Sequence, residues 1–183
     1  MDFLKLAKQR KTTYEFSSKD VSAANVKKVL EAGRLAPSAG NSQPWHLIVV
    51  RNEDKIQKLI ETVSPLHPFI SFNPPVIIGI VFEPDEWAKK HFPKKPETVN
   101  LTEPFLCIGM CTLSMALEAQ SLGIDSAILT PNPKIAGKLL KVKEPRIIPL
   151  VLGLGYESKD AYKKERERKS ADEIVSYEEY GKK

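Results

Sequence analysis

The chain has 183 residues, of which 42% are hydrophobic and 28% are charged. This is the composition of an ordinary globular protein with enough apolar material for a sizeable core, so it excludes intrinsic disorder and collagen-like repeats. Lys and Arg outnumber Asp and Glu by 28 to 23, which gives a formal charge of +5. The charges mostly alternate in sign, as in residues 163–169, which favours a solvated face over a nucleic-acid-binding surface.

The expected compartment is the cytoplasm. The two cysteines, Cys107 and Cys111, fall in one predicted helix, so a disulfide framework cannot hold this fold together and a reducing compartment is the default. Residues 1–16 lack the apolar core and the cleavage site of an export signal. The longest uncharged run, residues 104–117, is too short to span a bilayer, so we expect no membrane partner.

The first half of the chain predicts two helices and two core strands. Ser22 can cap a helix that Pro37 ends, and Asn52 can cap a second, amphipathic helix. Residues 46–51 form a short run rich in β-branched side chains, which predicts a strand buried on both faces. Residues 75–82 predict a second core strand, because their prolines stand only at its start.

The second half begins with a long connection over residues 83–100, which we interpret as a candidate lid. Thr102 as a cap and Gly123 after the last turn bracket a helix that is apolar nearly all round, which predicts a central, buried helix. The remaining expected elements are a strand over 125–130, a helix opening at Asn132, a strand over 147–156, and a charged tail over 158–183 that wraps the body.

Helices alternate with buried strands throughout, and no domain linker is visible. We therefore expect one domain over residues 1–183, of the α+β class, with helices layered around a mixed sheet. Common motifs of other classes are missing. Gly153-Leu154-Gly155 lacks the third glycine of a dinucleotide fingerprint, and there is no phosphate-binding loop and no zinc motif.

A polar loop over residues 37–45 has the chemistry of a ligand site. Gly40 and Asn41 tolerate left-handed backbone angles, while Ser38, Ser42 and Gln43 add hydrogen-bond donors and acceptors that could read the edge of a heteroaromatic ring. On residue chemistry alone, a simple turn between a helix and a strand explains this loop equally well.

A basic segment over residues 10–16 could bind a phosphate. Arg10 and Lys11 are followed by the hydroxyls of Thr12 and Thr13, and cations together with hydroxyls suit a phosphate dianion. Taken alone, a solvated helix end is the simpler interpretation, since cations there favour the helix dipole.

Taken jointly and in this order, the two segments resemble the nitroreductase family of FMN-dependent oxidoreductases, and the resemblance extends over essentially the whole chain. Arg10, Thr12 and Phe16 match the family's N-terminal pattern, and the polar loop matches its flavin loop. Three later stretches are also similar to the family: the helix end at 122–124 with the strand after it, residues 150–156, and residues 172–175 of the tail.

The resemblance implies a three-layer α/β/α fold with a C-terminal arm, and an obligate homodimer with FMN at the subunit interface and exchanged tail arms. The residues that it implies as cofactor-binding fall into four groups. They are Arg10, Lys11 and Thr12 on the phosphate and ribityl chain, assisted by Arg168 and Lys169; Pro37, Ser38, Ala39 and Asn41 on the flavin from the partner subunit; Leu129 and Thr130, whose backbone N–H groups approach the flavin N5; and Tyr14 at the N1 and O2 edge.

Two departures from the family pattern concern the redox end. Tyr14 stands where the family usually has a cation, and Pro131 stands where a small residue is commoner. A cation at that edge would stabilise reduced flavin, so Tyr14 is expected to lower the reduction potential unless another cation compensates.

The implied activity is ping-pong transfer of hydride from NADH or NADPH, through FMN, to a small organic acceptor such as a nitroaromatic, quinone, enone or halogenated phenol. No side chain need act as an acid or base, because the flavin carries the chemistry. One alternative is a specialised flavoprotein, such as a reductive dehalogenase or a flavin-fragmenting enzyme. Another is a basic binding module without catalysis, whose affinity for nucleic acid would fall steeply with salt.

Overall fold

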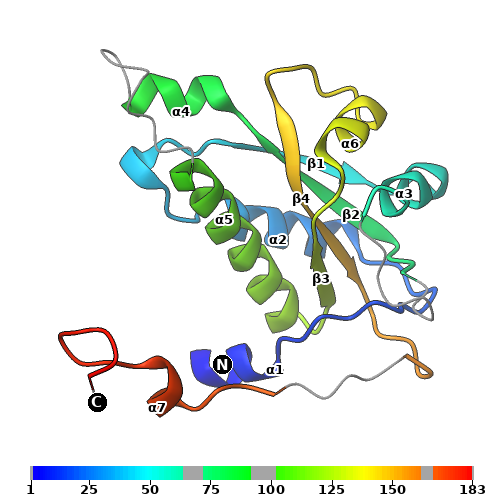
Figure 1. The fold of residues 1–183 in the computed structure, drawn as a ribbon. Coiled ribbons are helices and arrows are strands. Elements are labelled where there is room, and N and C mark those ends of the chain that lie inside the picture. Colours follow the sequence, from blue (N-terminus) through cyan, green and yellow to red (C-terminus); the bar gives the residue numbers. More distant parts are fainter. Residues whose placement is uncertain (1, 64–71, 92–101, 162–166, 183) are drawn as a thin grey trace.

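The computed structural model describes residues 2–63, 72–91, 102–161 and 167–182. Helices and strands alternate along these residues, as the sequence predicts (Figure 1). The elements are α1 (Phe3–Gln9), α2 (Ala23–Arg34), the short 3-10 helix η1 (Ala39–Asn41), β1 (Trp45–Val50), α3 (Glu53–Ile60), β2 (Val76–Phe82), α4 (Pro84–His91), α5 (Thr102–Ser121), β3 (Asp125–Leu129), α6 (Pro133–Leu139), β4 (Ile147–Gly155) and α7 (Ala171–Ile174).

The strands form one 4-stranded sheet in the order β1-β2-β4-β3. Each neighbouring pair of strands is antiparallel, whereas the sequence led us to expect a mixed sheet. This corrects the direction of the strands and leaves the α+β class unchanged. A parallel pairing does occur as an isolated bridge between Thr12 and Ser126 on β3.

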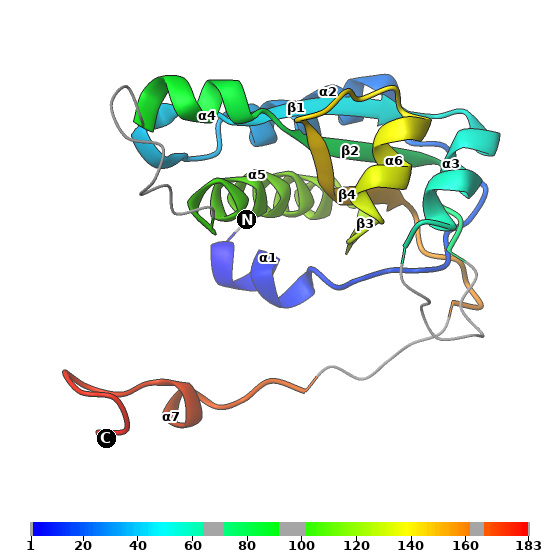
Figure 2. The ribbon, with the colours of Figure 1, turned by 45° about the horizontal axis from the view of Figure 1, so that its top comes forward.

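Apolar side chains cover both faces of the sheet, which makes the three layers. On β2, which is buried throughout, Ile78 and Ile80 belong to a core shared with α2 and α5, whereas Ile77 and Val81 belong to a core shared with α3 and α6. Alternate residues of a strand point to opposite faces, so a continuous apolar run is what a strand covered on both sides requires. In both ribbon views α3 and α6 lie on one side of the sheet and α5 on the other (Figure 2).

The predicted helix starts are largely confirmed. Ser22, Asn52 and Asn132 each cap a helix, with a side-chain oxygen that accepts a hydrogen bond from a backbone N–H of the first turn. Gly123 follows α5 with a φ of 70°, the left-handed conformation that favours glycine. The predicted start of α5 is off by one residue, because Thr102 is the first residue of the helix and not the cap before it.

The prediction that β1 is a core strand was wrong. The strand forms as expected, but it lies at an edge of the sheet, and Val50 alone of its six residues is buried. Val49 keeps 39% of its surface exposed. A short run of β-branched residues indicates a strand without telling where in the sheet it lies.

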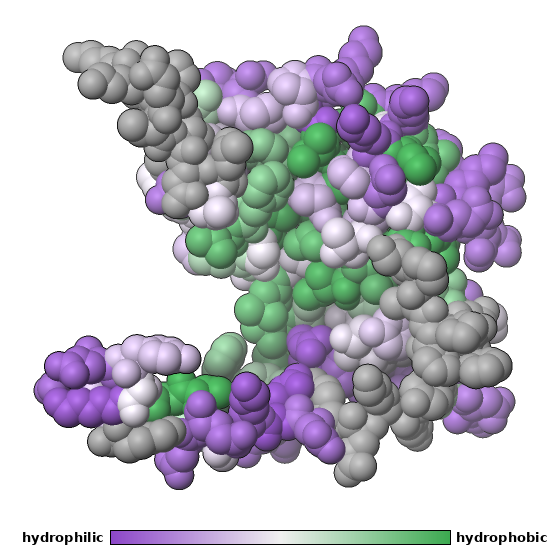
Figure 3. Space-filling view, viewed as in Figure 1, coloured by the Kyte–Doolittle hydropathy of each residue, from purple (hydrophilic) through white to green (hydrophobic). Residues whose placement is uncertain are grey.

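The prediction that α5 is buried all round was also wrong. One face of the helix, which includes Cys107 and Met115, is buried in the core. The opposite face carries an apolar stripe, which consists of Leu106 (64% exposed), Met110 (37%) and Leu113 (48%), and Phe105 (41%) adds to it at the start of the helix, beside Phe82. In Figure 3 hydrophobic surface gathers over α5, on the side where the molecule is hollowed between body and tail.

The start of the tail is attached to the body, where Ser158 N donates to the Glu15 carbonyl and Ala161 is buried, but its described residues from Glu167 onward do not wrap their own body. Every residue from Glu167 to Lys182 is exposed, and α7 stands apart from the rest of the chain (Figure 2). The large apolar side chains of this part are exposed as well, including Ile174 at 69% and Tyr177 at 67%.

The candidate lid is described only in its first part. Residues 84–91 form α4, and residues 92–100 lie outside the described residues. The base of α4 is fixed to the body, because Arg146 Nε donates to Glu83 Oε2 at 2.6 Å and Trp87 is buried in the core of α2 and α5.

Candidate functional site

The basic segment is held against the edge of the sheet by backbone hydrogen bonds. Thr13 N donates to the carbonyl of Ser126 on β3 at 3.0 Å. The side chain of Asn73 then bonds Phe16 through both of its polar atoms, because Asn73 Oδ1 accepts from Phe16 N at 2.8 Å and Asn73 Nδ2 donates to Phe16 O at 3.1 Å. The amide side chain of Asn73 thus satisfies both backbone polar groups of Phe16, as a neighbouring strand would. No pattern in the sequence points to Asn73, which lies 57 residues from its partner.

Two glycines of β4 make room for this anchor. A Cβ on Gly155 would lie 2.5 Å from the ring of Phe16, and one on Gly153 would lie 2.7 Å from the ring of Phe72. The two rings meet edge to face, with centroids 5.8 Å apart. The glycines that resemble part of a dinucleotide fingerprint therefore serve the packing of the basic segment.

Lys11 forms an ion pair with Glu157, just after the end of β4. The backbone N–H of Glu157 in turn donates to Asp125 Oδ2 at 2.8 Å. Neither carboxylate was among the predicted site residues. Arg10 caps the end of α1, and its backbone N–H donates to the Leu6 carbonyl at 2.9 Å.

The residues expected at the redox end gather along β3 and beside it. Leu129 is buried at the last position of the strand, and Thr130 follows it exposed. Tyr14 is half-buried against the core cluster that contains Leu129. Pro131 is buried and bridges to Val63. A single chain thus brings the basic segment, Tyr14 and the end of β3 to the same edge of the sheet.

The polar loop adopts the backbone that its glycine and amide residues suggest. Gly40, Asn41 and Gln43 have φ values of 54°, 53° and 46°. Left-handed angles at two non-glycine residues in so short a stretch carry strain, which asparagine bears better than most side chains do. The loop is closed by Ser38, whose Oγ accepts from Gln43 N at 3.0 Å.

The polar loop is attached to the start of α5. Ala39 N donates to the Sγ of Cys107 at 3.4 Å, so this thiol holds the loop as well as packing in the core. Burial raises the pKa of the neighbouring Cys111 thiol to about 12, which keeps it protonated and unreactive at neutral pH. Pro37 and Asn41 remain exposed on the loop.

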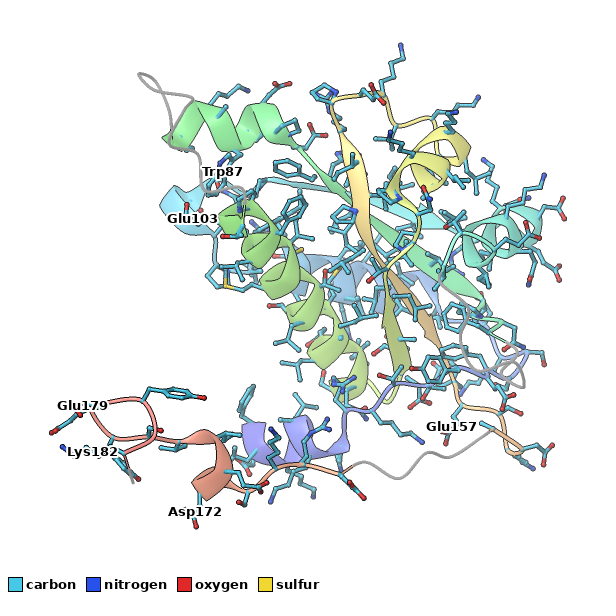
Figure 4. The ribbon with its side chains drawn as sticks, viewed as in Figure 1. Trp87, Glu103, Glu157, Asp172, Glu179 and Lys182 are labelled. Carbon is cyan, nitrogen blue, oxygen red and sulfur yellow. The ribbon has the colours of Figure 1, made fainter. Side chains whose placement is uncertain are left out.

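Within a single chain, the polar loop and the basic segment lie at opposite ends of α5. The loop is bonded to Cys107 in the first turns of the helix, whereas the basic segment is bonded to β3, which follows its last turn. At 1.5 Å per residue, α5 rises about 20 Å from Cys107 to its last residue, Ser121. Figure 4 shows the same separation, with Trp87 and Glu103 at one end of the molecule and Glu157 at the other. Arg168 and Lys169 lie on the exposed tail.

Each half of the candidate site contains a buried hydroxyl that bonds to nothing in the described part of the chain. These are Thr13 Oγ1 in the basic segment, where the residue is 2% exposed, and Ser42 Oγ in the polar loop, where it is 6% exposed. A buried hydroxyl without a partner loses the hydrogen bonds it would make to water, so such atoms mark places where a ligand can contribute. Over the described ranges, no group of three or more His, Cys, Asp or Glu side chains could hold a metal ion.

Comparison with known proteins places the chain in a family. The family model described as the nitroreductase family matches residues 7–66, which contain both the basic segment and the polar loop. A relative from Archaeoglobus fulgidus, provisionally named an NADH dehydrogenase/NAD(P)H nitroreductase, is 31% identical over 87% of this chain and 88% of its own length. The chain belongs to the nitroreductase family. An iodotyrosine dehalogenase 1 homolog from Caenorhabditis elegans is 24% identical over 94% of this chain and 60% of that protein.

Solved structures agree with this assignment. A nitroreductase family protein from Clostridium difficile 630 superposes with a TM-score of 0.81 and 29% identity, covering 98% of this chain and 99% of that one. A protein from Desulfovibrio desulfuricans, provisionally named a nitroreductase and solved in complex with FMN, shares the fold with a TM-score of 0.76 at 21% identity over 97% of this chain and 96% of that one. The α+β fold expected of this family member is therefore confirmed. Among the described residues, no helix is long and apolar enough to cross a membrane.

Proposed function

We propose that this member of the nitroreductase family is an FMN-dependent oxidoreductase, acting as one domain over residues 1–183, that moves hydride from NADPH or NADH to a small organic acceptor. The observation that carries the proposal is the pair of buried hydroxyls without partners, Thr13 Oγ1 and Ser42 Oγ, one in each segment that resembles the family's flavin site. Relatives and structural neighbours named as NAD(P)H nitroreductases and as an FMN complex support the same activity.

The donor set fits FMN. Arg10, Lys11 and Thr12 would hold the phosphate and the ribityl chain, since cations and hydroxyls are what a dianion requires. Pro37, Ser38, Ala39 and Asn41 would contact the ring, and Leu129 and Thr130 would offer backbone N–H groups at its N5. When bound, FMN supplies hydride acceptance from the nicotinamide and hydride donation to the second substrate, in a ping-pong sequence.

The functional form is a homodimer with FMN at the subunit interface. Within a protomer the polar loop and the basic segment lie about 20 Å apart along α5, so in this dimer each site takes the loop of one subunit and the segment of the other. The apolar stripe on α5 and the exposed tail supply surface for such an association. The tail arms are exchanged between subunits, and Arg168 and Lys169 reach the phosphate in that arrangement.

The acceptor is an aromatic or quinoid molecule admitted beside α4, the described part of the candidate lid. A reductive dehalogenase is the second candidate, favoured by the likeness to the iodotyrosine dehalogenase homolog. The enzyme works in the cytoplasm, where NAD(P)H is supplied, and its two free, buried thiols suit a reducing compartment.

The first test is the visible absorption spectrum of the purified protein, with identification of any flavin released on denaturation and titration with NADPH and NADH. We expect a yellow dimer that releases FMN and is bleached by at least one nucleotide. Aerobic and anaerobic screening with nitroaromatics, quinones and halogenated phenols then separates the two candidate activities. A colourless protein that fails to bind added FMN would contradict the proposal. Salt-sensitive binding of nucleic acid by that protein would instead favour a basic binding module.

A further inference from the structure

The ion pair between Lys11 and Glu157 places a carboxylate inside the proposed phosphate site. Lys11 is one of the two cations of the basic segment, yet its ammonium group is already engaged by Glu157. A second carboxylate, Asp125, lies on the same side and accepts from the backbone N–H of Glu157. A site that only had to attract a phosphate would gain nothing from these two negative charges.

The backbone that carries Glu157 is fixed from both sides. Ser17 N donates to the Tyr156 carbonyl at 2.7 Å, and Ser158 N donates to the Glu15 carbonyl at 3.0 Å. Together with the bond from Glu157 N to Asp125, these contacts hold the backbone of Glu157 in place. Lys11 is a long and flexible side chain by comparison, so the carboxylate sets where the ammonium group lies.

The pair is exposed enough to be exchanged. The Lys11 side chain keeps 40% of its surface in contact with solvent and the Glu157 side chain 23%. Ion pairs with this degree of solvation are weak, and a phosphate dianion attracts an ammonium group more strongly than a single carboxylate does. A phosphate that reaches Lys11 can therefore replace Glu157.

We propose that Glu157 is the counter-ion that positions Lys11 in the cofactor-free protein and is exchanged for the phosphate when FMN binds. This inference rests on the proposed function. Glu157 acts as an internal competitor, so the energy of breaking the ion pair is subtracted from phosphate binding and from nothing else. It tunes affinity for the phosphate group and leaves recognition of the flavin ring alone.

The test uses the full-length protein stripped of flavin, with FMN, riboflavin and inorganic phosphate as probes in equilibrium titrations. In Glu157→Gln we expect FMN and phosphate to bind about two- to fivefold tighter, because the cost of breaking an exposed pair is gone. Riboflavin, which lacks the phosphate, should bind as it does to the wild type. The dependence of FMN affinity on salt should become steeper, since Lys11 is no longer neutralised.

Two further variants show whether the gain in affinity depends on the ion pair itself. In the Lys11→Met background, Glu157→Gln should give a smaller gain in FMN affinity, because there is no pair left to break. Glu144→Gln makes the same charge change at an exposed residue before the start of β4, about 30 Å from Glu157 along the strand, and should leave FMN affinity unchanged.

The outcomes are distinguishable. Unchanged or weaker FMN binding by Glu157→Gln would overturn the exchange while leaving the flavoenzyme proposal standing. So would an equal gain in the presence and absence of Lys11, because Glu157 would then act by simple repulsion. Failure of the wild type to bind either flavin would contradict the proposed function itself.

Discussion

At the scale of single residues, Tyr14 is the side chain most expected to set the redox behaviour. It is half-buried against the core cluster that contains Leu129, the last residue of β3. We expect Tyr14→Arg to raise the flavin midpoint potential by some tens of millivolts, because a cation stabilises the reduced, anionic flavin. Spectroelectrochemical titration of the wild type and the variant measures this difference.

The matched control is Tyr14→Phe, which keeps the ring and adds no charge. Its midpoint potential should stay near that of the wild type. If the arginine variant shows no rise, the N1 and O2 edge of the flavin does not lie beside residue 14, and another cation must serve it.

Residue roles could be predicted from the sequence where they depend on near neighbours. Ser22 and Asn52 cap helices because their partners lie three residues ahead, so the local pattern contains all the information. Glu157 pairs with a lysine 146 residues away, and Asn73 bonds to a backbone 57 residues away. These contacts exist only once the chain has folded, so no local pattern predicts them.

At the scale of elements, Gly155 at the end of β4 leaves the space in which Phe16 packs, and Phe16 anchors the basic segment to the sheet. We expect Gly155→Ala to lower the free energy of unfolding by about 1–3 kcal/mol, because the added Cβ would lie 2.5 Å from Phe16 and 2.8 Å from Pro75, and neither ring can easily move. Chemical denaturation measures the loss. FMN affinity should fall as well, since Phe16 anchors the segment that carries Lys11.

Gly137→Ala on α6 is the corresponding control. Its Cβ would meet only the Val142 carbonyl, at an ordinary contact distance of 3.7 Å, so the variant should be as stable as the wild type or up to about 1 kcal/mol more stable. Equal stability of Gly155→Ala and the wild type would show that Phe16 can be displaced without cost.

The elements themselves were largely predictable, but their place in the sheet was not. A continuous apolar run indicated β2 correctly, and a cap followed by an amphipathic pattern indicated α3, because each of these signals lies within the element itself. The run over β1 indicated a strand and wrongly suggested a central one. Whether an apolar run is covered depends on what packs beside it, and that is decided by parts of the chain far away in sequence.

At the scale of the whole molecule, the same limit explains α5 and the tail. A helix that is apolar nearly all round was expected to be buried, and half of it is covered by the chain's own core. The other half carries the apolar stripe, and Ile174 of the tail is 69% exposed. The sequence thus contains more hydrophobic surface than one protomer buries, which is what a chain that completes its core with a second copy requires.

The apolar stripe offers the most direct test of that arrangement. We expect Leu106→Glu to weaken self-association by more than about a hundredfold, because burial of a leucine contributes about 1.5–3 kcal/mol and a dimer loses two of them. Sedimentation analysis gives the oligomeric state, and the flavin content of the same samples gives the occupancy. Both should fall together, since in the proposed dimer the polar loop and the basic segment meet only across the interface. Ile135→Glu places the same charge on α6, at a residue 54% exposed on the other side of the sheet, and should remain dimeric and yellow. A Leu106→Glu monomer that still holds FMN would mean that one protomer binds the cofactor alone, and the two halves of the site would then have to move toward each other along α5.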